Sequence, residues 1–320
     1  MPFEATYIHS QLSASAAGRL VEAHYPLSGP IRSLFYVSGL HDNYLIEQDS
    51  VRYILRVYRN DWRTAEEVNF ELELLAFLNE RNALVACPVS TIAGKLHFYI
   101  QSPEGERIAA LFHFANGDAL DTGLSPDVCI LLGRAVAQVH QAADTFTTKY
   151  QRPHLDAQHL LDESIEMIKP FVDGDNHSYL VQLHKRLRNT WPALPKQSGT
   201  FGICTGDVNA KNFHIDVNRK ITLFDFDQCG YGFRAFEIGK FSSSLVMSGM
   251  KQTLLNAFLA GYQEVRSLSD AEIEAITYFE IIAIIWVMAI HAKNANRIGY
   301  QFLEKPFWDK KVALLKTLYN

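Results

Sequence analysis

Short runs rich in apolar residues and bounded by turn residues occupy much of the first third of the chain, a pattern typical of β-strands, and the run at 51–58 alternates between apolar and polar residues. This pattern predicts strands at residues 34–37, 43–47, 51–58, 89–92, 96–101 and 108–114. From Thr64 to about Arg81, apolar residues instead recur at helical spacing, and Thr64 followed by Glu67 matches a capping box. A shorter helix is expected at residues 14–24. We therefore predict a small, sheet-rich region with one main helix.

Helical spacing dominates the rest of the chain. Ser125 followed by Pro126 is a strong helix start signal, and Ser269 with Glu272 starts another helix in the same way as Thr64. The apolar run from Ile281 to Ile290 is about half of what a bilayer span needs, so we expect a buried core helix there. The predicted helices cover residues 125–145, 157–171, 176–191, 234–247, 251–265, 269–295 and 305–319.

One predicted β-hairpin, with strands at 213–216 and 220–224, interrupts these helices. A hairpin brings its two ends together, so Asp207, Asn212 and Asp225 in the flanking loops are expected to converge. Carboxylate and amide oxygens suit Mg²⁺, which completes its octahedron with water and substrate phosphates. The sequence therefore predicts a magnesium site, with further polar groups in the same loops at Asn209 and Asp227.

Arg56 lies within a strongly apolar predicted strand. It is either a solvated charge on an edge strand or one half of an interior ion pair. Glu71, on the flank of the following helix, could be its partner, although most helix glutamates are solvated.

Composition narrows the functional classes. A chain of 320 residues with 48% hydrophobic content is long enough for two lobes. The net charge of −5 and the absence of charge blocks give no support for nucleic acid as a partner. The four cysteines lack a paired spacing, so neither a zinc site nor a disulfide framework is indicated. Without signal-peptide features at its start, the chain is expected to be cytoplasmic, with no membrane partner.

Two motifs stand out, Thr-Gly-Asp-Val-Asn-Ala-Lys-Asn at 205–212 and Leu-Phe-Asp-Phe-Asp at 223–227. Together with residues 53–59, 70–72 and 111–117, they resemble the aminoglycoside phosphotransferase and choline kinase-like family, which includes type II homoserine kinases. The resemblance implies an α+β, bilobal protein kinase-like fold. Its small β-rich nucleotide-binding lobe would cover residues 1–115, its mainly helical catalytic and acceptor-binding lobe would cover 116–320, and the hinge would lie at about 111–118.

The same resemblance implies an ATP- and Mg²⁺-dependent phosphotransferase. It would move the γ-phosphoryl group to a hydroxyl of a small molecule: an amino acid, an amino alcohol or an aminoglycoside. Asp207 would be the base, Asn212 and Asp225 would hold Mg²⁺, and Arg56, oriented by Glu71, would bind phosphates. The resemblance also implies that the turn with Ser38, Gly39 and Asn43 lies over the nucleotide, and that the backbone near Phe112 and Phe114 hydrogen-bonds to the adenine. Asn209, Lys211 and Asp227 would be accessory groups of the site.

Several positions depart from the family pattern, among them Arg56, where lysine is frequent, and the turn at 38–43, which holds one glycine. Thr205 and Asn209 stand where histidine is usual, and Glu237 stands where aspartate is usual and so could change how the catalytic hairpin is braced. Two alternatives therefore stay open: a non-catalytic nucleotide-binding relative, and a serine/threonine protein kinase that uses the same site. Other candidate ligands, including His140 and Trp286, are expected to be core or helix-face residues.

Overall fold

The fold is described from a computed structural model, in which residues 6–120, 123–250 and 252–319 are placed. Internal contacts divide these residues into two units. Unit 1 holds the residues up to Asp118 together with Phe146–Arg152 and His214–Phe224; unit 2 holds Ala119–Thr145, Pro153–Phe213 and the residues from Asp225 onward.

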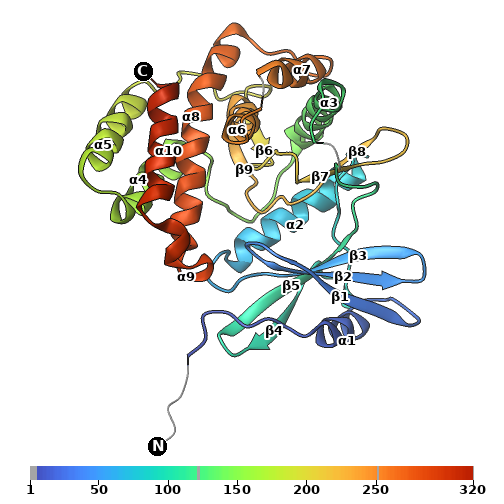
Figure 1. Cartoon of the computed structure of the whole chain (residues 1–320). Helices are drawn as coiled ribbons and strands as arrows, with labels where there is room; N and C mark the ends of the chain where they lie inside the picture. Colours follow the sequence, from blue (N-terminus) through green and yellow to red (C-terminus); the bar gives the residue numbers. More distant parts are fainter. Residues whose placement is uncertain (1–5, 121–122, 251, 320) are drawn as a thin grey trace, which may run out of the picture. The chain divides into compact units, whose positions relative to one another are not determined.

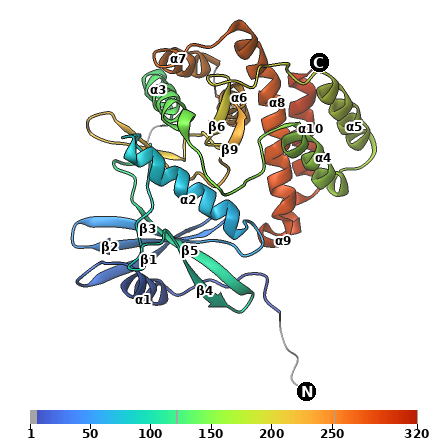
Figure 2. The ribbon, with the colours of Figure 1, turned by 180° about the vertical axis from the view of Figure 1, so that it is seen from behind.

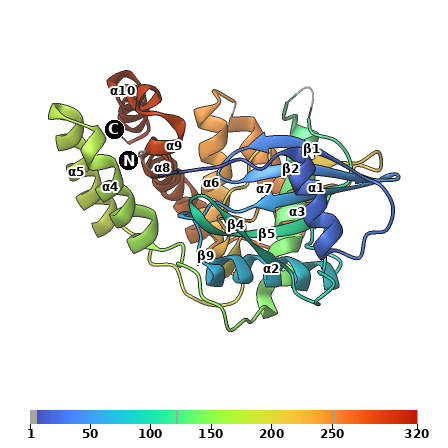
Figure 3. The ribbon, with the colours of Figure 1, turned by 90° about the horizontal axis from the view of Figure 1, so that it is seen from below.

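Unit 1 is built on a five-stranded antiparallel sheet of order β1-β2-β3-β5-β4 (Figure 1). Helix α1 (Ala14–His24) packs on β1 and β2 (Figure 3). Because strand side chains alternate between faces, Tyr53 and Leu55 of β3 enter the core beneath α1, while Arg56 points to the opposite face. The strands are β1 (Ile31–Ser38), β2 (Asp42–Gln48), β3 (Val51–Val57), β4 (Phe98–Ser102) and β5 (Gly105–His113).

Helix α2 (Ala65–Glu80) begins with the capping box that the sequence predicts. The Thr64 hydroxyl accepts from the Glu67 amide at 3.2 Å, and the Glu67 carboxylate accepts from the Thr64 amide at 2.8 Å. These bonds satisfy two amides that a helix N-terminus otherwise leaves unpaired. The apolar stripe of the helix is buried, and Glu71 beside it is buried as well.

The strand predicted at residues 89–92 is wrong. The Val89 amide bonds to Leu111, whereas the Ile92 amide bonds to His24, so the segment does not follow one neighbouring strand. Pro88 before it has no amide hydrogen to donate and forms only an isolated bridge, with Phe112.

Unit 2 is mainly helical, and its helices follow the predicted ones closely. They are α3 (Pro126–Ala142), α4 (Glu163–Ile168), α5 (Gly174–Asn189), α6 (Arg234–Met247), α7 (Gln252–Gln263), α8 (Asp270–Lys293), α9 (Ala295–Ile298) and α10 (Lys305–Leu318). The helix predicted at 157–171 is broken into a π-helix (Gln158–Asp162), α4 and a 3₁₀ turn (Lys169–Phe171). Lys251, the first residue of another predicted helix, lies outside the described residues.

Helix α8 lies in the core of unit 2, beside α6 and α4 (Figure 2). It is the one described helix long and apolar enough to cross a membrane, but 67% of its most apolar window is buried inside the protein. Gly239 lets α6 pack closely against α8, because a Cβ at this position would lie only 2.7 Å from the Cβ of Phe279 on α8. Trp286 is buried too, which confirms the prediction of a core helix.

Four short strands complete the fold. The predicted hairpin is present as β7 (Phe213–Ile215) and β8 (Ile221–Leu223). A second pair, β6 (Phe201–Cys204) and β9 (Gly230–Phe233), was not predicted, because each strand has four residues and includes glycine.

Candidate active site

The β6–β9 pair brings together the two polar loops that flank the hairpin. Cys204, at the end of β6, pairs with Gly230, at the start of β9. The loop that leaves β6 therefore starts beside the loop that enters β9. Gly206 packs directly on the second loop, where any Cβ would overlap the carbonyl of Gln228, and its φ of +82° is in the left-handed region. Only glycine suits this contact.

Asp207 follows Gly206, and its carboxylate is held at both oxygens. Oδ1 accepts from the ammonium of Lys240 at 2.6 Å, and Oδ2 accepts from Nδ2 of Asn212 at 3.0 Å. Nδ2 of Asn212 also donates to the Asp207 carbonyl at 2.9 Å. The Asp207 side chain nevertheless stays 32% exposed, so it is oriented and still accessible to a substrate.

Asn209 shapes the same loop. Its Nδ2 donates to the Asp207 carbonyl at 3.0 Å, and its Oδ1 accepts from the Lys211 amide at 2.8 Å. These bonds form the local turn typical of asparagine in loops. The side chain of Lys211 is exposed.

The second loop contributes two acidic residues in different settings. Asp225 is half-buried and has a left-handed φ of 61°, a conformation that is uncommon outside glycine and that clusters at functional sites. Asp227 is only 2% exposed and accepts from the side-chain amide of Gln228 at 2.8 Å. Of these two residues, Asp225 is the more accessible.

Glu237, in the first turn of α6, braces the loop before Asp207. Its buried carboxyl group accepts from the amides of Thr205 and Gly206, the latter at 3.0 Å, and from the Thr205 hydroxyl at 3.1 Å. Thr205 and Glu237 both depart from the family pattern, and here they bind each other.

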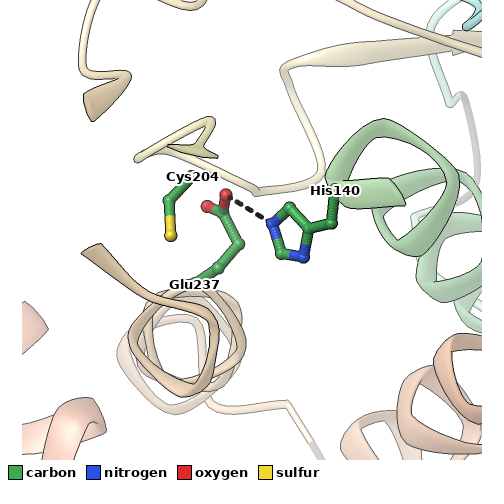
Figure 4. A group of neighbouring side chains, drawn as sticks. All are labelled: His140, Cys204 and Glu237. Carbon is green, nitrogen blue, oxygen red and sulfur yellow. Dashed lines mark hydrogen bonds and ion pairs between the residues drawn. The ribbon is translucent and has the colours of Figure 1, made fainter. Parts of the chain in front are cut away.

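His140 of α3 and Cys204 lie against Glu237, with ligand atoms of the three residues within 4.8 Å of one another (Figure 4). Burial lowers the pKa of His140 well below its ordinary value, raises the pKa of the Cys204 thiol well above its own, and raises the pKa of Glu237 to about 7. To bind a metal ion, this cluster would need Cys204 as a thiolate and Glu237 with free carboxylate oxygens. Glu237 already accepts from the loop, and His140 bonds to Tyr262 at 2.8 Å. We assign the cluster as a structural brace, in agreement with the expectation that His140 is a core residue.

In unit 1, Arg56 forms an interior ion pair. Its Nη1 lies 3.0 Å from Oε1 of Glu71, whose side chain is 1% exposed. The hydroxyl of Tyr58 donates to the other oxygen of Glu71 at 3.2 Å, and Nε of Arg56 lies 3.5 Å from Oδ1 of Asn43. Arg56 is therefore not a solvated edge charge, and its guanidinium is held in one orientation.

The turn between β1 and β2 is closed by its own hydrogen bonds. The Ser38 hydroxyl donates to Asp42 at 3.0 Å, and the Gly39 amide donates to the carbonyl of His41 at 3.0 Å. Asp42 is buried and bound by Arg107 at 2.9 Å. A Cβ at Gly39 would meet no atom within 4 Å, so this position does not require glycine.

The segment expected to bind adenine includes the end of β5 and the residue after it. Phe112 pairs with Ile54, and the ring of Phe112 lies 5.3 Å from the Arg56 guanidinium. The Phe114 amide donates to the Arg52 carbonyl at 3.1 Å, and the Arg52 guanidinium lies 4.1 Å above the Phe114 ring. The Phe114 amide therefore already donates a hydrogen bond within unit 1.

Lys240 lies outside the motifs that predict the site. It lies one turn after Glu237 on α6 and is 4% exposed. A lysine inside the apolar stretch Phe-Glu-Ile-Gly-Lys-Phe is the signal that could have indicated it, because lysine is almost never buried without a partner.

A unit built on an antiparallel sheet and a mainly helical unit together define a protein kinase-like phosphotransferase fold. The first unit carries the Arg56–Glu71 pair, and the second carries the Asp207 loop. The solved structure of an amicoumacin kinase in complex with AMP-PNP, Ca²⁺ and Ami shares this fold, with a TM-score of 0.79 at 18% identity over 96% of this chain and 93% of that one. This likeness confirms the predicted fold.

Residues 36–272 match the family described as "Phosphotransferase enzyme family", and the chain belongs to it. An uncharacterized protein of Synechocystis sp. is 35% identical over 313 residues, which cover 97% of this chain and 87% of that protein. The amicoumacin kinase of Bacillus subtilis is 24% identical over 251 residues, 74% of each chain. The homoserine kinase of Neisseria meningitidis serogroup B is 25% identical over 237 residues, 72% of this chain and 73% of that one. The predicted family and enzyme class are thereby confirmed.

Proposed function

We propose that this phosphotransferase moves the γ-phosphoryl group of ATP, with Mg²⁺, to a hydroxyl of a small molecule, and that Asp207 is the base. The observation that carries the proposal is the Asp207 carboxylate itself. It is accessible, yet Lys240 and Asn212 fix both of its oxygens and Glu237 braces the loop behind it. Phosphoryl transfer asks a protein mainly for such positioning and for charge stabilisation.

In the proposed reaction, Oδ2 of Asp207 accepts the proton of the acceptor hydroxyl. A carboxylate oxygen can accept two hydrogen bonds, and Asn212 uses one of them. The acceptor oxygen forms a bond to the γ-phosphorus while the bond from that phosphorus to the bridging oxygen breaks, releasing ADP. The proton ends on Asp207 and then passes to solvent.

We assign the magnesium ion to Asn212 and Asp225, whose side chains carry the oxygen donors that such a site needs. Nδ2 of Asn212 is turned toward Asp207, which leaves its Oδ1 without a partner among the described residues. Asp225 supplies a carboxylate, and hard oxygen donors of this kind are what Mg²⁺ prefers. When bound, the metal would neutralise phosphate charge. Asp227, being buried, is assigned a structural role.

In unit 1, we assign Arg56 to the α- and β-phosphates. Glu71 and Asn43 orient its guanidinium, which presents donors in a planar fork that matches phosphate oxygens. The turn that holds Ser38 and Gly39 would lie over the nucleotide. The segment from Phe112 to Phe114 would bind the adenine through backbone groups other than the Phe114 amide.

Two of the relatives support a class of acceptor. One is named for amicoumacin and one for homoserine, and homoserine carries both an amine and a hydroxyl. We therefore propose an amino acid, an amino alcohol or an aminoglycoside as the acceptor.

The test is a screen for ADP release over these three compound classes, with the Asp207→Ala protein as the blank. Asp207→Ala is expected to lower turnover on the order of 10²-fold or more. Asp175→Ala, an exposed aspartate in the first turn of α5, is the matched control and should keep full turnover. Undiminished phosphoryl transfer by the Asp207→Ala protein to the identified acceptor would refute the assignment of Asp207 as the base. In parallel, ATP should raise the melting temperature more with Mg²⁺ than without it, and Asp225→Asn should abolish that difference.

A further inference from the structure

Lys240 is a buried cation whose ion pair is made with the proposed base. Its side chain is 4% exposed, and its ammonium lies 2.6 Å from Oδ1 of Asp207. Burying a lysine is costly, and a buried ion pair is often no more stable than apolar residues of similar volume. Stability alone is therefore a poor reason for a charge at this position.

Helix α6 holds the Asp207 loop at successive points. Glu237 binds the backbone amides of Thr205 and Gly206, and Lys240, three residues later on the helix, binds the side chain of Asp207. Residues three apart on a helix lie on the same face. One helix face therefore sets both the path of the loop and the direction of the carboxylate.

We propose that Lys240 is a positioning residue for the phosphoryl transfer. By occupying Oδ1 of Asp207, it turns Oδ2 toward the acceptor hydroxyl, and it exchanges no proton in the reaction. This inference rests on the proposed function, in which Asp207 accepts the acceptor proton. Lys211, which is much closer to Asp207 in sequence, does not fill this role, because its side chain is exposed while Lys240 holds the carboxylate.

The experiment is a double-mutant cycle of Lys240→Met and Asp207→Ala, measured as kcat and KM with the identified acceptor. Lys240→Met keeps the volume and removes the charge. It should lower kcat by about 10- to 100-fold, because a misdirected reacting group costs rate of this order, and it should leave the KM for ATP within about twofold. In the Asp207→Ala protein, the same change should alter the residual kcat by less than about twofold, because residues that act as a unit are not additive.

Two further variants separate positioning from folding. Lys240→Arg keeps the charge and should recover part of the lost kcat, and Lys240→Gln supplies a neutral donor if the methionine protein does not fold. Lys311→Met is the matched control: Lys311 is a half-buried lysine on α10 that contacts Met247, and its replacement should leave kcat unchanged.

Full kcat in Lys240→Met, or an equal loss of kcat in both backgrounds, would overturn the role of Lys240. The base assignment fails separately, when Asp207→Ala alone retains turnover.

Discussion

Replacing Glu237 by glutamine tests the brace behind Asp207. The substitution keeps the volume and one acceptor oxygen, which can still receive the Gly206 amide and the Thr205 hydroxyl. The other oxygen, which accepts from the Thr205 amide, becomes an NH₂ group that can only donate. The Thr205 amide, in a buried site, is then left facing another donor.

The magnitude follows from that lost acceptor. An unsatisfied buried donor costs about 1–3 kcal/mol, which lowers the melting temperature of a domain of about 150–250 residues by roughly 2–4 °C per kcal/mol. A displaced loop should also move Asp207, and turnover should fall about 10-fold or more.

The effect on stability depends on pH. Because burial raises the pKa of Glu237 to about 7 in the folded protein, folding retains a proton on this group at pH values where the unfolded chain releases it. The stability that this proton contributes is fully present below the ordinary pKa of 4.5 and is lost as the pH rises through 7. The wild type should therefore lose up to about 3 kcal/mol between pH 5 and pH 8 that the glutamine variant does not lose.

The assay is urea unfolding of both proteins at pH 6 and pH 8, with turnover measured alongside. The difference in free energy of unfolding should be larger at pH 6 than at pH 8. Glu280→Gln is the control for the lost acceptor and should keep full turnover, because this buried carboxyl group accepts from the Ser242 hydroxyl and glutamine can accept the same bond. Equal stability of wild type and Glu237→Gln at pH 6, with unchanged turnover, would refute the brace.

Two other predictions concern the nucleotide clamp, by which we mean the Arg56–Glu71 pair, and the contact of Gly206 with Gln228 in the second loop. Arg56→Met should raise the KM for ATP about 10-fold or more, since hydrogen bonds to charged groups contribute roughly 1.5–3 kcal/mol, and Glu71→Gln should raise it less. Arg32→Met, which removes a cation that is 69% exposed, should not change it; equal KM values in all four proteins would contradict the clamp. Gly206→Ala should cost about 1–3 kcal/mol and most of the turnover, because its Cβ would overlap the Gln228 carbonyl. Urea unfolding checks this, and wild-type stability would argue against it.

Features with local causes were predictable. The capping box at Thr64, the helix start at Ser125 and the apolar run of α8 depend on residues a few positions apart, and each is present. Spacing also placed Asp207 and Asn212 in one loop, where they bond to each other. Two of the failures involve pairing at long range: the strand at 89–92 is absent, and the sequence does not predict the β6–β9 pair. A third is the helix predicted at 157–171, which is divided into three pieces.

By itself, the sequence determined most of the helices and strands, the family and the loop that carries Asp207, because periodicity, caps and motif spacing depend on short stretches of chain. Only the tertiary structure decided what holds that loop. Glu237 and Lys240 reach it from a helix some thirty positions further along the chain, and His140 supports Glu237 from nearly a hundred positions earlier. Such contacts depend on how α6 and α3 pack. No periodicity records that packing, and its traces in the sequence are single residues: Glu237, where the family pattern has aspartate, and Lys240, inside an apolar stretch.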